Sequence, residues 1–195
     1  MARIIVAAAA SILLATACGG PQASAPSSAA PAPASPTASG ATRVEGTVKS
    51  NDSGHVTLAD GTSFDVIRAT RVVRSQAGTP ADLKPGLFVA ITAKEQPDKT
   101  LLASIVSVFP DSLSKVVTAG QRPLTGGNLM TNAAIDQVSG SSFTVTFPGG
   151  AAKIDLALGV QIIRQSDVQA SDITVGSKIS ASILNSAAQS VTIQQ

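Results

Sequence analysis

The stretch ADLKPG at residues 81–86 is repeated as SDITVG at residues 171–176, an offset of 90 residues. Both stretches carry an aspartate at the second position, an aliphatic residue at the third and a glycine at the sixth. We expect each aspartate to cap a single helical turn and each glycine to let the chain bend into a strand. A turn that recurs at a fixed distance indicates a duplicated module.

The residues before this turn match as well. At the same offset, FDV at 64–66 corresponds to IDL at 154–156, and VVR at 72–74 corresponds to IIR at 162–164. The best offset changes to 87 nearer the start of each copy and to 85 near its end, and each change falls at a turn-like segment. This pattern favours duplication with loop insertions and deletions over chance matching of small apolar residues.

Within each copy, apolar and polar residues alternate with a period of two. Val44, Gly46 and Val48 alternate with polar neighbours, and Asp60-Gly61 is a two-residue hairpin signal. β-Branched residues dominate, and no helical stripe extends beyond one turn. We therefore predict an all-β fold, with five or six short strands per copy closed into a small barrel, because closure removes exposed strand edges.

The chain divides into five predicted segments. Residues 19–41 contain only Ala, Pro, Ser, Gly, Thr and one Gln, so they cannot bury a core, and at about 3.1 Å per residue they reach on the order of 70 Å. A module of this size is marginally stable alone, so packing between the copies is an alternative to two independent barrels. The predicted segments are a signal peptide (1–17), a disordered tether (18–41), a first OB-like β module (42–110), a linker (111–127) and a second OB-like β module (128–195).

Cys18 is the only cysteine, and it follows an apolar run at residues 4–14. That run is shorter than the roughly 20 residues of a membrane-spanning helix and is typical of a signal peptide. We predict cleavage between Ala17 and Cys18 and lipid attachment to the Cys18 thiol. Ordinary secretory cleavage at the same bond is the alternative, but it would expose a free thiol in an oxidising compartment. With no Asp after Cys18, we expect the outer membrane, facing the periplasm or the cell surface.

The composition argues against several kinds of partner. The formal net charge is only +2, and the chain has no Trp, no Tyr and five Phe. A nearly neutral surface does not attract nucleic acid, and a base- or sugar-stacking platform needs aromatic side chains. We expect no nucleic-acid partner, and the membrane is reached only through the lipid anchor.

The motifs of the first copy resemble a known family. They are a V-x-G-x-V opening (residues 44–48), a D-G-T hairpin (60–62), a D-L-K-P-G turn (82–86), and a last strand that contains Ala103 and Val106. This set resembles bacterial extracytoplasmic domains of unknown function that are often tandem and lipoprotein-borne. The resemblance implies an OB-like small-barrel fold and an envelope location, and it carries no catalytic residue. The second copy lacks the opening glycine and the D-G-T hairpin.

His55 is the only histidine, so the chain offers no zinc ligand set. A general base would need a nucleophile and an orienting carboxylate nearby, and no Gly-x-Ser-x-Gly elbow or Ser-x-x-Lys motif accompanies His55. We interpret His55 as an exposed residue beside the Ser53-Gly54 turn, at the start of a strand. We predict no catalytic residue, no metal and no cofactor, and we expect that the protein is not an enzyme.

The candidate anion-binding residues are Arg68, Arg74 and Arg164. Arg68 and Arg74 would share one face of a strand, and Arg164 occupies the position of Arg74 in the second copy. Guanidinium groups bind carboxylates and phosphates, so the face suits an anionic glycan or a lipid headgroup, although a solvated strand face is the plain alternative. We predict a lipid-anchored, non-catalytic binding or adaptor module for another envelope protein or a glycan, with a structural or assembly subunit as the alternative.

Overall fold

The computed structural model describes residues 40–195, and these residues form an all-β protein, as the alternating pattern predicts. They all belong to one compact unit. The predicted signal peptide, Cys18 and the tether up to residue 39 lie outside the described residues. In the described part, no helix is long and apolar enough to cross a membrane.

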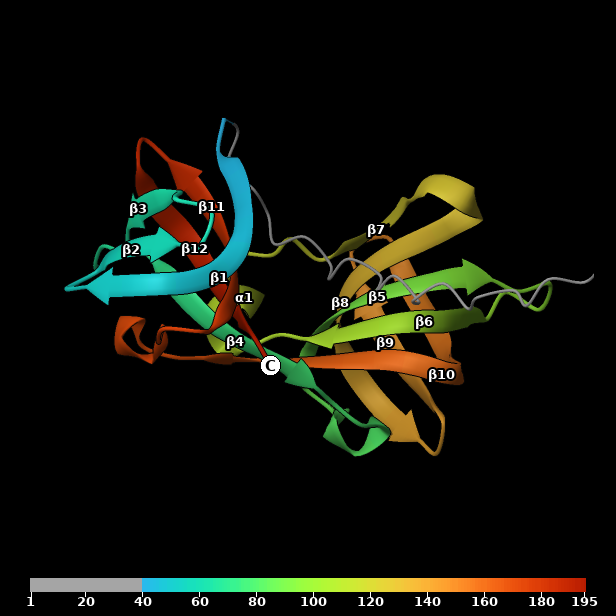
Figure 1. The fold of residues 1–195 in the computed structure, drawn as a ribbon. Helices are drawn as coiled ribbons and strands as arrows, with labels where there is room; N and C mark the ends of the chain where they lie inside the picture. Colours follow the sequence, from blue (N-terminus) through green and yellow to red (C-terminus); the bar gives the residue numbers. More distant parts are fainter. Residues whose placement is uncertain (1–39) are drawn as a thin grey trace, which may run out of the picture. The chain divides into compact units, whose positions relative to one another are not determined.

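Twelve strands and four short helical turns make up this unit (Figure 1). The strands are β1 (Thr42–Asp52), β2 (His55–Leu58), β3 (Ser63–Asp65), β4 (Arg71–Ala77), β5 (Phe88–Glu95), β6 (Leu101–Val108), β7 (Gly120–Pro123), β8 (Asn128–Ser139), β9 (Ser142–Phe147), β10 (Gly150–Asp167), β11 (Lys178–Leu184) and β12 (Ala187–Gln194). The turns are η1 (Pro80–Asp82), α1 (Asp111–Ser114), η2 (Thr125–Gly127) and η3 (Ala170–Asp172).

Five strands pair in a closed ring, which we call ring A. β1 pairs with β2, β2 with β3, β3 with β12, β12 with β11, and β11 returns to β1. Only β3 and β12 are parallel neighbours in this ring. β4 follows β3 along the chain and continues beside β12, also in parallel.

A second closed ring, ring B, has the same order of pairing. β8 pairs with β9, β9 with β10, β10 with β6, β6 with β5, and β5 returns to β8. Its one parallel pair is β10 and β6. β7 adds to the outside of β8, and β4 pairs antiparallel with β10, which joins the two rings into one sheet.

Both rings mix strands from the two sequence copies. Ring A combines β1 to β3 of copy one (residues 42–110) with β11 and β12 of copy two (residues 128–195), and ring B combines β8 to β10 with β5 and β6. Figure 1 shows this mixing by colour, because blue strands lie beside red ones in ring A and green beside orange in ring B. The structure thus differs from the prediction that each copy closes on itself. The reason is that the chain crosses from one ring to the other along β4 and along the 18-residue β10, so the strands that follow each of them complete the other ring.

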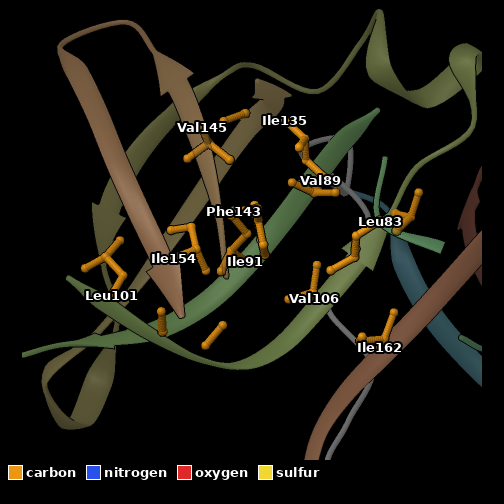
Figure 2. Close-up of a cluster of buried hydrophobic side chains, with 14 residues drawn as sticks. Leu83, Val89, Ile91, Leu101, Val106, Ile135, Phe143, Val145, Ile154 and Ile162 are labelled. Atoms are coloured by element: carbon orange, nitrogen blue, oxygen red, sulfur yellow. The ribbon is translucent and has the colours of Figure 1, made fainter. Parts of the chain in front are cut away.

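The buried side chains follow the same division. Ring A encloses a cluster that includes Val56 and Phe64 from copy one and Ile179 and Val191 from copy two, all at most 1% exposed. The cluster in ring B joins apolar side chains that point toward one another from β5, β6, β8, β9 and β10 (Figure 2). Neither copy holds a complete core, so neither can bury its apolar surface alone.

The repeated turn has the predicted form in both copies. Thr79 N–H donates to Asp82 Oδ2 at 2.7 Å, and Gln169 N–H donates to Asp172 Oδ2 at 2.8 Å, so each aspartate caps its helical turn. Leu83 is 4% exposed in the core of ring B. Its counterpart in copy two, Ile173, is 1% exposed in the core of ring A. We call Leu83 and Ile173 the plug residues, because each turn buries one of them in the core of a ring.

Two features of the connection between the copies complete the fold. The first is a short helix, because α1 covers the start of the segment predicted to be a linker and buries Leu113. Strand β7 lies inside the segment predicted to be a linker, at residues 111–127. Its sequence GQRP carries no apolar alternation, so no strand signal was present there.

Candidate functional site

The three predicted arginines do not form one cluster. Arg74 lies on β4, Arg164 on β10, and Arg68 is exposed in the segment between β3 and β4. Arg74 Nη2 lies 3.5 Å from Asp172 Oδ1, and Arg164 Nη1 lies 3.6 Å from Asp82 Oδ1. Each of these two arginines thus faces the capping aspartate of the other copy.

Arg74 lines an open hollow of about 440 Å3, which we call the arginine hollow. The hollow lies where β4, β11 and β12 meet the turn after η3, and neither Arg68 nor Arg164 lines it. Polar side chains dominate its wall, and the ones that bear on binding are Arg74, Asp172, Ser177, Lys178 and Gln194.

The electrostatics of this hollow favour an anion. The side chain of Arg74 is 27% exposed, and its Nε is buried without a hydrogen-bond partner among residues 40–195. Lys178 is exposed in the lining of the same hollow, and no acidic side chain of the described residues forms an ion pair with it. Among the side chains that line the hollow, Asp172 supplies one negative charge and Arg74 and Lys178 supply two positive ones, so the lining side chains carry a net positive charge that attracts an anion.

A second hollow of about 550 Å3 adjoins the first. Thr174 and Val175 line both hollows, and the far side of the second is formed by the β1–β2 turn, with Asn51 and Ser53. Asn51 Nδ2 donates to the carbonyl oxygen of Ile173 at 2.9 Å, which holds that turn against the copy-two turn. Val175 is 68% exposed, so its apolar side chain projects between the two hollows.

The equivalent position in copy one has a different character. At the 90-residue offset, Lys178 corresponds to Phe88, whose ring stacks on Phe109 with centroids 6.3 Å apart. A cation at this position is therefore present only beside ring A. The Arg164–Asp82 ion pair has Lys84 of its own turn nearby instead, and Arg164 does not line the arginine hollow, so Arg164 serves as a control for that hollow.

Asp82 carries the clearest electrostatic signature of the two capping aspartates. The hydrogen bond from the Thr79 backbone N–H holds the pKa of Asp82 below its ordinary value, and the Thr79 hydroxyl and the Arg164 guanidinium act in the same direction. The carboxylate is therefore ionised at neutral pH, and its negative charge strengthens the hydrogen bonds that hold the turn.

His55 is exposed at the start of β2, beside the Ser53-Gly54 turn, as predicted, and it has an acidic neighbour. His55 Nδ1 lies 2.8 Å from Asp65 Oδ1 across the β2–β3 pair, and both side chains are more than half exposed. Within residues 40–195, no hydroxyl group hydrogen-bonds to the imidazole, and no group of three or more metal-ligating side chains occurs. The pair has the form of an orienting dyad without a nucleophile.

The sequence pointed to Arg74 but not to its neighbours in the hollow. Lys178 begins β11, and Val175 belongs to the repeated turn, and both come from the other copy. Only the exchanged pairing of β4 with β12 brings these residues beside Arg74. The pairing of His55 with Asp65 was readable in principle, because the Asp60-Gly61 hairpin places the two residues on neighbouring strands.

Comparisons with protein-family models, with curated proteins and with solved structures give no match to this chain. The resemblance to extracytoplasmic domains thus stays a prediction from the motifs of the sequence.

Proposed function

We propose that this protein is a non-catalytic binding or adaptor module of the bacterial cell envelope, and that the arginine hollow receives a carboxylate group of a glycan or protein partner. The observation that carries the proposal is that Arg74 and Lys178 line the same hollow, with Asp172 as the single acidic side chain in that lining. The partly exposed guanidinium of Arg74 offers directed hydrogen bonds to an oxyanion. The second hollow, beside Val175, offers a further surface that the rest of the partner can contact.

Lipid anchoring is part of the proposal. Cys18 follows a signal-peptide pattern, and the composition of residues 19–41 predicts a tether that could reach on the order of 70 Å. The variant Cys18→Ser should therefore leave the membrane fraction and appear among soluble exported proteins. If this variant stays membrane-bound after a salt wash, the anchoring part of the proposal is wrong.

Binding to an acidic sugar tests the hollow. The probe is a uronic-acid oligosaccharide, compared with a neutral oligosaccharide of equal length, and titration calorimetry is carried out on the exported chain that carries Cys18→Ser. Loss of a charged hydrogen bond costs about 1.5–3 kcal/mol, so Arg74→Gln and Lys178→Gln should each weaken binding roughly tenfold or more. Added salt should weaken it too.

Arg164→Gln is the matched control for this titration. Arg164 also faces an aspartate, at 3.6 Å, but it does not line the arginine hollow. Its substitution should leave the affinity unchanged. Equal weakening by Arg164→Gln and Arg74→Gln, or equal affinity for the neutral sugar, would remove the case for a carboxylate site at Arg74.

A structural or assembly role is the second candidate function. Strand β7 ends the path of strand pairing, and among the described residues it pairs only with β8. An open strand edge is a place where another chain can add a strand. Pro123 at the end of β7 limits how far such pairing can extend. Leu124 N–H donates to the Asn128 carbonyl oxygen, so by the alternation of an antiparallel pair the N–H of Gln121 points away from β8. Gln121→Pro would therefore remove a further backbone donor from this edge and should abolish assembly, whereas carboxylate binding at Arg74 should persist.

A further inference from the structure

The ladder between β4 and β10 is symmetric with respect to the duplication. Ser75 lies opposite Gln165, and these two residues occupy equivalent positions at the 90-residue offset. On either side, Val73 lies opposite Asp167, and Ala77 lies opposite Ile163. Interchanging the copies converts the Val73–Asp167 pair into the Ala77–Ile163 pair and leaves the Ser75–Gln165 pair in place. The ladder therefore has the symmetry of a two-fold interface.

Backbone hydrogen bonds between the copies come in the same reciprocal pairs. Gly86 N–H donates to the Ile135 carbonyl oxygen, and Gly176 N–H donates to the Val48 carbonyl oxygen, both at 2.8 Å. The hinge residues that lead out of β4 and β10 behave alike: Gly78 N–H donates to Ile162, and Val168 N–H donates to Val72. Each copy therefore donates to the other the same backbone hydrogen bonds that it accepts from it.

The ion pairs complete this reciprocity. Arg74 of copy one faces Asp172 of copy two, and Arg164 of copy two faces Asp82 of copy one. A two-fold homodimer that exchanges strands has this arrangement, in which a residue of one subunit contacts its partner residue on the other in both directions. Here a single chain carries both halves.

We propose that two molecules of this chain can also exchange their halves. In that dimer, residues 42–110 of each molecule complete the two rings with residues 128–195 of the other molecule. The contacts are the same whether the copies belong to one chain or to two, so the connection between β6 and β7 decides between the forms through effective concentration. In the single chain, Leu113 is 3% exposed and Ser112 hydrogen-bonds to Asp167. These contacts dock the connection and favour exchange within the chain.

A disulfide at the symmetry axis reports which chain supplies each copy. Cβ atoms of directly opposed residues lie about 4.5–5.5 Å apart in an antiparallel pair, close to disulfide reach. The variant Ser75→Cys/Gln165→Cys is made in the Cys18→Ser background, which has no other cysteine. After oxidation in dilute solution, we expect a closed disulfide and the mass of one chain. The two single-cysteine variants report adventitious disulfides.

Deletion of residues 111–118 from this double-cysteine variant is the first test, because the connection should then be too short to join the copies of one chain. We expect light scattering to show a doubled mass, and non-reducing gels to show a covalent dimer. A monomer, whether its disulfide has formed or not, would overturn the proposal.

Refolding of the double-cysteine variant with its full connection is the second test, and it does not depend on the deleted chain folding. The variant is diluted from urea at increasing protein concentration. The fraction of doubled-mass, disulfide-linked species should rise with concentration, because exchange between chains becomes competitive. A refolded product that is monomeric at every concentration would overturn the proposal.

Discussion

At the scale of single residues, the capping aspartates carry more of the fold than their exposure suggests. Asp82 fixes the turn that inserts Leu83 into ring B, and the capping role of both aspartates was predictable from the repeated motif. The partner of each was not predictable. Arg164 faces Asp82 only because the strands are exchanged, and no spacing within one copy encodes that contact.

Acid should reveal the contribution of Asp82. Its pKa is lowered from 3.8 in the folded protein, so the carboxylate stabilises the fold above that pH, and the stabilisation is lost as the pH falls through the folded-state pKa. We expect Asp82→Asn to lower the urea midpoint at neutral pH. The difference from the unsubstituted chain should shrink as the pH falls below 3.8.

Asp52→Asn is the charge-matched control, because Asp52 is an exposed aspartate at the end of β1. This variant should follow the unsubstituted chain at every pH. A midpoint difference for Asp82→Asn that stays constant into strongly acidic solution would show that the charge of Asp82 does not support the turn.

At the scale of elements, the sequence specified most strands and turns, with β7 as an exception, but it did not specify which strands are neighbours. A period of two determines which face of a strand is buried, and a two-residue hairpin determines the next strand, so pairs such as β1–β2 and β8–β9 follow directly. The pattern does not specify the pairing of strands that are distant in sequence. The two copies offer similar apolar edges, Val106 in β6 and Val191 in β12, and the pattern cannot tell which edge completes which ring.

The plug residues of the repeated turns distinguish the two possible pairings. Ile173 is 1% exposed, and it packs in ring A with Val56 and Phe64 of the other copy. Ile173→Ala should cost about 2–5 kcal/mol of unfolding free energy. Hydrogen exchange should accelerate in β1 and β2 more than in β8 and β9, although β8 and β9 belong to the same copy as Ile173.

Leu83→Ala is the mirror control for Ile173→Ala. Leu83 packs in ring B, so its truncation should accelerate exchange in β8 and β9 more than in β1 and β2. The exchanged arrangement would be contradicted if each substitution loosened chiefly the strands of its own copy.

At the scale of the whole molecule, the two rings belong to one compact unit rather than to two separate modules. Each core contains side chains of both copies, and the β4–β10 ladder joins the rings. The arginine hollow is a product of this arrangement, since Arg74 comes from copy one and Lys178 from copy two. The domain boundaries expected from the repeat mark the ends of sequence copies, and the compact unit spans both.

Cutting the chain between the copies tests this arrangement most directly. A protease site inserted after Val117, in the connection between α1 and β7, yields two fragments that each contain one copy. We predict that the nicked protein elutes as one species with the mass of the uncut chain, and that its fragments separate only in denaturant. Two fragments that part under native conditions, each still folded as a monomer, would contradict the exchanged fold.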